Sequence, residues 1–437
     1  MQRVTVTTCG TSILTRRLRA EDFQFLADNL TENEMKALLR KINANAQENS
    51  PTQILEEACK NSYSTLIANA NKHENEYPAD EKANLNDLVE IKRELIKRSD
   101  EELCCWLSAE LNGFIRYYRR ENAIAQAKND VHYLIHTDTY QGQLTASLVQ
   151  TWFETQNIKN ITSVTIEKLN TASISDFRQG IDTLIVWCHD NLSQYRGLND
   201  WKVIFNLVGG FKALQGYMQT LGMFYADETV YIFESGKELL TIPKLPVDLA
   251  SETKEAVLKE DNFTIFRRLC RLYDQSVSLP LSECEGKIPD TLYEINGDNC
   301  TLSSWGLLIW ENIWEEQYSK KLLPPITQRI KFTEKAKKKA KELQENDKER
   351  LKKLNQRLDM LALKLNSQDV KEDNDWLDTN CGLRILKGNH EEQPNSTHEF
   401  SLWRQQSGKR GYCHRDGDTW IIDDFAEHLS SNTYKSS

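Results

Sequence analysis

The segment Gly10-Thr11-Ser12 combines residue types that can bind an anion. It follows an alternating β-branched run at residues 3–8, which predicts a strand that ends just before the segment. A glycine lets the backbone approach a ligand closely, and the two hydroxyl groups can donate hydrogen bonds to a phosphate. Gly10, Thr11 and Ser12 are therefore candidate ligand-binding residues, although an ordinary turn can have the same composition.

Two further loops have the same character. Gly209 and Gly210 follow a predicted strand and precede a helical pattern that begins near Lys212, where helix N-terminal amides and the lysine would attract an anion. Asp138 and Thr139 also lie between a strand and a helix, where either side chain could simply cap the helix. Each loop alone is explained by a turn or a cap, whereas together they predict a ligand crevice at one sheet edge.

The spacing of these residues argues against two common nucleotide sites. Neither Gly-x-Gly-x-x-Gly nor a P-loop sequence occurs at these strand ends, so we expect neither a dinucleotide cofactor nor ATP hydrolysis. The ten cysteines are scattered, and the adjacent Cys104 and Cys105 cannot supply the spaced ligands of a zinc site. The sequence thus predicts no cofactor, no metal and reduced, mostly structural thiols.

Residues 1–247 are predicted to form an α/β Rossmann-like domain, because β-branched runs alternate with helical patterns as in βαβ units. These runs are residues 3–8, 131–137, 163–169, 202–208 and 229–234. Residues 20–128 are rich in Glu, Lys, Leu and Ala and predict a helical insertion or an elaborated crossover.

A second region, residues 248–325, is predicted to form a helical linker, with a helical pattern over residues 248–274, followed by a small winged-helix-like module. Pro243 and Pro246 place a domain boundary near Val247, and a serine-capped apolar run begins after Ser303. Its part from residue 279 onward is poor in Lys and Arg, which disfavours a DNA-reading helix, so we expect no specific DNA partner.

Residues 326–437 predict an α+β domain in which two N-terminal helices pack on an antiparallel sheet. Three strand-like runs follow the helical pair, and Asp416-Gly417-Asp418 predicts a hairpin between the last two. Residues 326–364 contain 13 Lys or Arg against 6 Asp or Glu, although the whole chain has a net charge of -10. Any contact with RNA should therefore be local.

We expect a cytoplasmic protein without a membrane partner. No apolar run of 18 residues occurs, and the first predicted strand leaves no room for a signal peptide.

The first region resembles the CARF domains, the CRISPR-associated Rossmann-fold sensors, over about residues 1–247. The resemblance is carried by Thr-Cys-Gly-Thr-Ser at 8–12, Thr-Asp-Thr at 137–139 with Gly142, and Asn-Leu-Val-Gly-Gly-Phe-Lys at 206–212. It implies a homodimer that binds a cyclic oligoadenylate across its two-fold axis, with cyclic tetra-adenylate expected over cyclic hexa-adenylate. It also implies that Ser12 and Lys212 could support slow cleavage of the activator, a ring nuclease activity.

The last region resembles the RelE-family mRNA interferases. The resemblance is carried by a strand and a Lys-rich helix at 326–341, Leu-Lys-Gly at 386–388, Phe-Ser-Leu-Trp-Arg at 400–404 and Lys-Arg-Gly-Tyr at 409–412. It implies a metal-independent endoribonuclease that cleaves mRNA in the ribosomal A site, with the ribosome and mRNA as partners. In that reaction the ribose 2′-hydroxyl attacks the adjacent phosphate, helped by proton transfer and cationic stabilisation.

Strand alternation, combined with this resemblance, selects catalytic candidates. Arg410, Tyr412 and His414 should share one open face of the sheet, and His428 follows the last strand. Arg410 would hold the scissile phosphate, because a guanidinium group is permanently charged and bidentate. His414 and His428 would act as acid and base, and Tyr412 would position or stack the substrate.

Trp403 could stack an RNA base, and Arg404 and Lys409 are further RNA-binding candidates. The same face carries Glu399 and Ser401 where many RelE relatives have lysines, so a different acid–base assignment is expected. Each histidine taken alone could equally be an ordinary surface residue.

These resemblances together predict a ribosome-dependent ribonuclease that cyclic oligoadenylate activates as part of type III CRISPR antiviral defence, by differential affinity for two states of the protein. One alternative is a cyclic-nucleotide-responsive regulator whose middle module reads DNA. Another is a stand-alone ring nuclease, which would leave residues 326–437 without a role.

Overall fold

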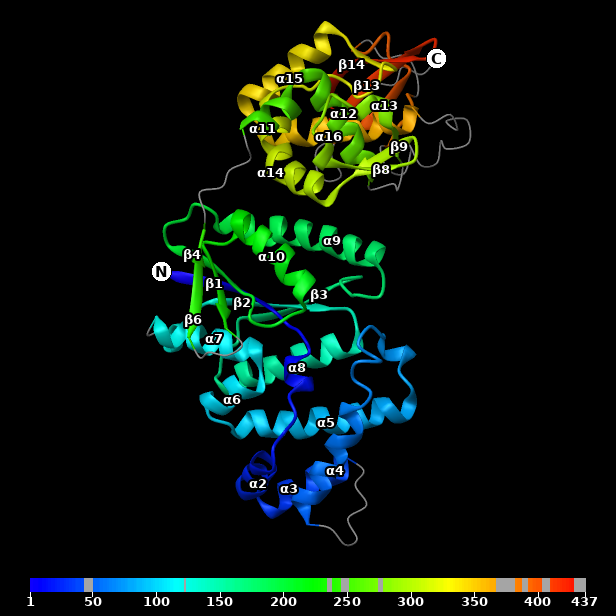
Figure 1. Ribbon diagram of the computed structural model, residues 1–437. Helices are drawn as coiled ribbons and strands as arrows, with labels where there is room; N and C mark the ends of the chain where they lie inside the picture. The colour runs from blue at the N-terminus through cyan, green and yellow to red at the C-terminus, as the bar shows by residue number, and fades with distance from the viewer. Residues whose placement is uncertain are drawn as a thin grey trace, which may run out of the picture. The chain divides into compact units, whose positions relative to one another are not determined.

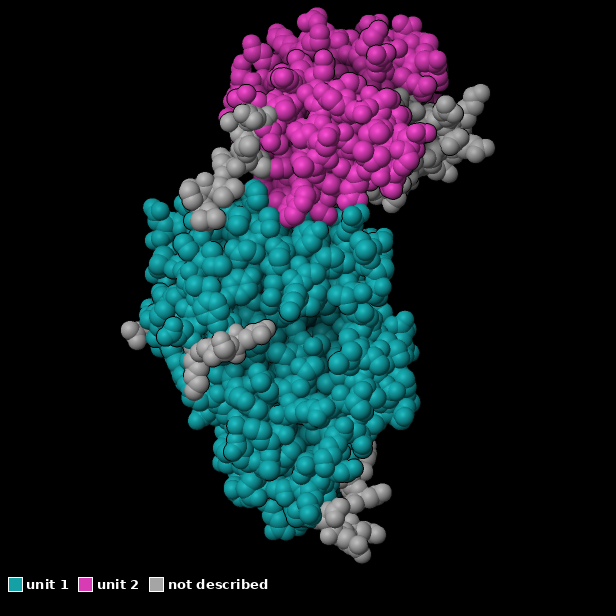
Figure 2. Space-filling view, in the orientation of Figure 1, with its two compact units in different colours: residues 1–247 teal, residues 248–437 magenta. Residues whose placement is uncertain are grey.

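The computed structural model describes residues 1–42, 50–121, 123–233, 238–244, 251–273, 278–366, 382–386, 392–402 and 409–427. The chain divides into two compact units, Met1–Val247 and Asp248–Ser437 (Figure 2). Within the described ranges, no helix combines the length and apolar character needed to cross a membrane. Every cysteine in these ranges is buried and free.

The first unit is built on a six-stranded sheet with the order β3-β2-β1-β4-β5-β6. The strands are β1 (Gln2–Thr8), β2 (Val131–Thr137), β3 (Ile161–Ile166), β4 (Trp201–Asn206), β5 (Glu228–Ile232) and β6 (Leu239–Pro243). β1 to β5 are parallel and coincide with the predicted runs to within a few residues, whereas β6 is antiparallel to β5 and was not predicted. A parallel sheet of this kind is compatible with a Rossmann-like domain.

Helices cover both faces of this sheet (Figure 1). On one face lie α7 (Ala109–Arg120) and α8 (Tyr140–Thr155), and on the other lie α9 (Ile174–Leu192), α10 (Lys212–Tyr225) and the short turn η3 (Ser193–Tyr195). Because both faces are covered, β1 is buried without interruption from Arg3 to Thr8.

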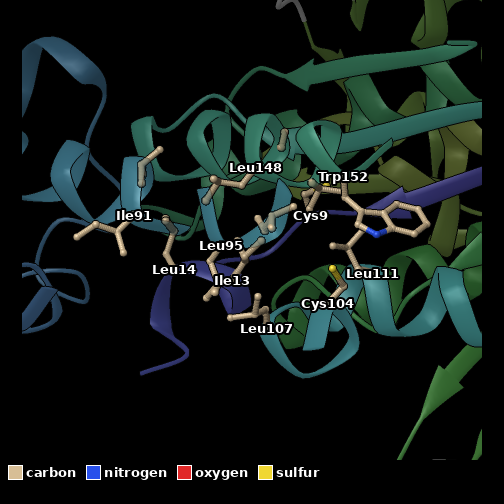
Figure 3. Packing of buried hydrophobic residues seen from close by; sticks show 14 of the residues in the cluster. Cys9, Ile13, Leu14, Ile91, Leu95, Cys104, Leu107, Leu111, Leu148 and Trp152 are labelled. Carbon is tan, nitrogen blue, oxygen red and sulfur yellow. The ribbon is translucent and has the colours of Figure 1, made fainter. Parts of the chain in front are cut away.

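The segment between β1 and β2 is mostly helical, as predicted. It contains α1 (Ser12–Thr15), α2 (Ala20–Asn29), α3 (Glu32–Lys41), α4 (Pro51–Tyr63), η1 (Glu74–Glu76), α5 (Ala79–Arg98), α6 (Glu101–Leu107), α7 and η2 (Ile124–Lys128). Its apolar side chains join those of α8 in one core, where Ile13 and Leu14 of α1 meet Ile91 and Leu95 of α5 (Figure 3). The insertion is therefore an elaborated crossover that shares the core of the sheet.

The second unit contains a five-stranded sheet with the order β10-β14-β13-β12-β11. The elements are β10 (Ile330–Phe332), α15 (Glu334–Asn346), α16 (Lys348–Asn366), β11 (Arg384–Ile385), β12 (His398–Ser401), β13 (Lys409–Asp416) and β14 (Thr419–Glu427). The three predicted runs pair antiparallel as β12, β13 and β14. β11, which was not predicted, is antiparallel to β12, and β10 is parallel to β14. The two helices supply the long crossover that a parallel pair needs.

The same unit contains a small antiparallel sheet with the order β7-β9-β8. The elements are α11 (Ser251–Leu258), α12 (Glu260–Tyr273), β7 (Leu279–Pro280), α13 (Leu281–Cys284), η4 (Asp290–Leu292), β8 (Tyr293–Asn296), β9 (Asn299–Leu302) and α14 (Ser304–Lys320). The element immediately before the β8–β9 hairpin, where a winged helix would place its reading helix, is the single turn η4. The winged-helix assignment and a division at residue 325 stay predictions, because α12 and α14 both pack against α16.

Candidate functional site

The carboxyl ends of β1 and β4 are neighbours, and the chain leaves these two strands toward opposite sides of the sheet. Such a topological switch point is where open α/β sheets bind ligands. The Gly10 loop follows β1 and the Gly209–Gly210 loop follows β4, so the fold brings two of the predicted loops together. Thr8 Oγ1 ties them directly by donating a hydrogen bond to the Gly209 carbonyl oxygen at 2.7 Å.

The glycines at this point are required by the packing of one loop on the other. A Cβ atom at Gly10 would lie 2.6 Å from the backbone nitrogen of Gly210, which has a φ of +98°. A Cβ atom at Gly209 would overlap the carboxylate of Glu110. Glycine therefore shapes the crevice by letting two backbones touch, before any ligand is considered.

Gly10→Ala should lower the free energy of unfolding by about 1–3 kcal/mol, because the added methyl group meets backbone atoms that cannot rotate away. Chemical denaturation of the intact chain measures this loss. Gly216→Ala is the matched control, since a Cβ atom at Gly216 of α10 meets nothing within 4 Å and alanine favours the helix. Equal stability of the two variants would contradict the loop contact.

Glu110, which the sequence did not single out, lies at the centre of the switch point. Its side chain is completely buried, and Oε1 accepts a hydrogen bond from the Gly10 amide at 2.8 Å. Oε2 accepts from Ser12 Oγ at 2.6 Å and from Ser108 Oγ at 2.7 Å. An acidic residue in the first turn of a helix is common, so no sequence signal marks this one.

These contacts correct the expectation that Gly10 and Ser12 offer free donors to a phosphate. Ser12 Oγ donates to Glu110 and accepts from the Ala109 amide at 3.0 Å, so both of its hydrogen-bonding roles are used. The Glu110 carboxylate accepts the hydrogen bonds that Gly10 and Ser12 were expected to donate to a ligand, because residues 108–110 pack against the β1–α1 loop.

Thr11 and Lys212 remain accessible. Thr11 is half-buried ahead of α1, and its side chain makes no capping hydrogen bond there. Lys212 is exposed as the first residue of α10, directly after the two glycines. The positive end of the α10 dipole and the ammonium group together make this the most favourable place at the switch point for an anion.

Thr139 caps the following helix, the alternative that the sequence left open, whereas Asp138 has a different structural role. Thr139 is buried and caps α8, with Oγ1 accepting from the Gly142 amide at 3.2 Å. Asp138 Oδ2 accepts from the Lys168 amide at 2.7 Å and fixes the loop after β3, while His73 of the crossover lies 3.1 Å from the Asp138 carbonyl oxygen. Neither residue presents its side chain to the β1–β4 crevice in this arrangement.

The second candidate site lies on the five-stranded sheet. Phe400 pairs with Gly411, and Phe400 and Phe425 join the core under α15 and α16. Glu399, Tyr412 and Asp424 pair across the three strands on the opposite face, as strand alternation predicted.

This face is not open at its centre, which corrects the role given to Tyr412. Tyr412 is 0% exposed, and Glu399 and Asp424 are also buried. The buried Gln393 donates from Nε2 to Asp424 Oδ2 at 2.7 Å, so the segment before β12 covers part of the sheet. Because its ring is buried in this arrangement, Tyr412 is not accessible for stacking on a substrate.

His414 forms a pair with Asp423, which the sequence reasoning missed. His414 Nδ1 lies 3.0 Å from both carboxylate oxygens of Asp423, and Ser396 Oγ donates to Asp423 Oδ2 at 2.8 Å. The pairing of β13 with β14 shifts register beside Asp423, and such a bulge re-aims a side chain toward the same face as its neighbour. A half-exposed imidazole oriented by a carboxylate is suited to proton transfer.

Arg410 is half-exposed four residues before His414 on β13, and its Nη1 donates to the Lys409 carbonyl oxygen at 3.2 Å. Strand geometry separates such positions by about 13 Å, so the two side chains must lean over the buried Tyr412 to reach one phosphate. Lys409 is half-buried at the start of the strand. Trp403, Arg404 and His428 lie outside the described residues.

Residues 106–245 match the family model of a CRISPR-associated protein, Cas_APE2256. The Cas_APE2256 match supports the CRISPR-associated part of the resemblance. It contains Glu110 and the Gly209–Gly210 loop with Lys212, but neither β1 with its Gly10 loop nor any part of the second unit. No curated protein matches the chain.

In the described part of the chain, no group of three or more His, Cys, Asp or Glu side chains could hold a metal ion.

Proposed function

We propose that this chain is an effector of type III CRISPR defence in which the first unit senses cyclic oligoadenylate and the second cleaves mRNA on the ribosome. The observation that carries the proposal is the meeting of two glycine loops at the switch point of a parallel sheet, one of them within the Cas_APE2256 match. Its tests are activator binding by the first unit and activator-dependent cleavage by the second.

The sensing step rests on the β4 side of the crevice. Lys212 and the N-terminal amides of α10 would hold a phosphate of the ring, while the half-buried Thr11 faces the same loop region from β1. A two-fold symmetric ring suits a homodimer that presents this loop pair twice. Cyclic tetra-adenylate is the proposed activator, and cyclic hexa-adenylate is the alternative ring.

Lys212→Ala should weaken binding of cyclic tetra-adenylate about 10- to 100-fold, the value of one charge-assisted hydrogen bond. Calorimetric titration of the intact chain measures the change. Lys36→Ala is the matched control, because Lys36 is an exposed lysine of α3 that pairs with Glu32. Unchanged affinity in Lys212→Ala would place the ligand elsewhere.

The cleavage step uses the face that carries Arg410 and His414. The ribose 2′-oxygen attacks the adjacent phosphorus and the bond to the 5′-oxygen breaks, which leaves a cyclic phosphate and a 5′-hydroxyl. His414, oriented by Asp423, would take or supply the proton that this exchange requires, and His428 is the proposed second group. Arg410 would neutralise the charge that develops on the phosphate.

The DNA-binding alternative is disfavoured by the second unit. The η4 turn ahead of the β8–β9 hairpin is only Asp290–Leu292 and carries no basic residue. The ring nuclease alternative is disfavoured at one of its two proposed residues, because the Ser12 hydroxyl group is held by Glu110 and by the Ala109 amide.

A further inference from the structure

Lys92 is a completely buried lysine in the crossover helix α5. Its Nζ donates to the backbone carbonyl oxygens of Ile13, of Leu14 at 3.2 Å and of Arg16 at 2.6 Å. These carbonyls belong to α1 and to the residue that ends it, and α1 begins two residues after Gly10. Lys92 therefore closes the carboxyl end of the helix that follows the first ligand loop.

This contact is important for α1 because the helix has only four residues and cannot be stable in isolation. Its start is held by Glu110 through Ser12 Oγ, and its end is held by Lys92. A cation is also the favourable charge at the negative end of a helix dipole. The two buried charges, both contributed by the crossover, thus define where the β1–α1 loop lies.

Helix α5 is in turn fixed to the sheet domain. Arg93, next to Lys92, donates to Thr151 Oγ1 at 3.0 Å and to Ser147 Oγ at 3.3 Å, both on α8. Ile91 and Leu95 pack in the core beside Ile13 (Figure 3). Lys92 is therefore presented to α1 from a rigid support.

We propose that Lys92 is a positioning residue of the cyclic oligoadenylate site, which fixes the β1–α1 loop and adds positive potential beneath it. The inference rests on the proposed function and extends it, because it gives the helical crossover a part in ligand binding. The Cas_APE2256 match begins at residue 106 and so does not include Lys92.

The charge of Lys92 changes within an accessible pH range. Burial lowers its pKa to about 7, with Arg16 lowering it further and Cys59 and Asp22 raising it. Burial also raises the pKa of the Cys59 thiol to about 12. It raises the pKa of the Tyr63 hydroxyl as well, and the ring of Tyr63 lies 5.6 Å from Lys92 Nζ. Between pH 6 and 9, Lys92 therefore changes charge while the Cys59 thiol and the Tyr63 hydroxyl stay protonated.

The free energy of unfolding and the affinity for cyclic oligoadenylate should change with pH in opposite directions. An unfolded chain has a lysine pKa of about 10.4, so it binds more protons than the folded state above pH 7, and stability rises with pH. Affinity for an anionic ring should instead fall as Lys92 loses its proton. A merely structural role of Lys92 would give no such opposite trend.

The experiment measures binding of cyclic tetra-adenylate to the intact chain between pH 6 and 9. Wild type should lose about tenfold in affinity across this range, because one charge close to a protein surface changes the binding energy of a nearby anion by that order of magnitude. Lys92→Met should bind about tenfold more weakly than wild type at pH 6, with a flat pH profile. Lys97→Met is the control, because Lys97 lies on the same helix, is exposed and pairs with Glu94, and it should follow wild type.

Three outcomes are decisive. Wild-type affinity that does not change with pH, or a Lys92→Met variant that binds as tightly as wild type at pH 6, overturns the role of Lys92 while leaving the sensor intact. Failure of wild type to bind any cyclic oligoadenylate overturns the proposed sensing function, and the role of Lys92 with it. If Lys92→Met does not fold, the wild-type pH profile alone decides.

Discussion

Asp359→Asn should lower the free energy of unfolding of the second unit by about 3–5 kcal/mol, since it strips a buried arginine of its partner. Arg267 of α12 and Asp359 of α16 form an ion pair in which both side chains are 1% exposed. The Tyr318 hydroxyl also donates to Asp359, and Arg267 Nη1 donates to the Pro324 carbonyl oxygen at 2.8 Å. This cluster joins the small-sheet segment to the helices of the larger sheet.

Hydrogen exchange of α16 in the intact chain measures this effect without separating the units. Glu349→Gln is the matched control, because Glu349 lies on α16 at the surface with 71% of its side chain exposed, and its pairing with Lys352 should contribute little. Protection of α16 that is equal in the two variants would mean that the pair does not join the segments. A large loss only in Asp359→Asn is the expected result.

Arg410→Ala should reduce mRNA cleavage by about 100- to 1,000-fold, the usual cost of removing one group that stabilises developing charge. Arg410 is half-exposed on the same strand as His414, and it is the group proposed to hold the scissile phosphate. Tyr412, two residues further along the strand, is buried. Single-turnover cleavage on programmed ribosomes, with activator present, measures the rate.

Arg415→Ala provides the comparison for Arg410. Arg415 lies on the same strand but is exposed at the hairpin turn, where it donates to the Gly417 carbonyl oxygen at 2.8 Å and pairs with Asp418. Its loss should leave the rate near that of wild type. Equal rates in Arg410→Ala and wild type would remove Arg410 from the active site and favour the His414–Asp423 pair as the only centre on this face.

The parallel sheet could be predicted because its strands carry their signal locally. Strands buried on both faces need β-branched runs, as β1 shows, and such runs mark β1 to β5 to within a few residues. The edge strand β3 carries such a run although it is partly exposed, whereas the other edge strand, β6, has fewer β-branched residues and was missed. The meeting of the Gly10 and Gly209 loops followed from the rule that parallel strands end at one edge.

The charged groups that shape the first site could not be predicted. Glu110 and Lys92 reach the β1–α1 loop from about 80–100 residues away along the chain, and neither belongs to a spaced motif. In the second unit, alternation correctly placed Tyr412 on the face opposite the core. Strand alternation could not predict that the segment containing Gln393 covers part of this face. The hydrogen bond from Gln393 to Asp424 depends on the path of a loop and not on strand periodicity.

The most direct test of the account is toeprinting of translating ribosomes with the purified chain, with and without cyclic tetra-adenylate. A ligand-gated ribonuclease should cut mRNA at the A-site codon only when the activator is present. The Arg410→Ala variant should give no cuts, and the Arg415→Ala variant should cut as wild type does. Absence of cuts with every cyclic oligoadenylate, or equal cutting without any activator, would contradict a ligand-gated ribonuclease.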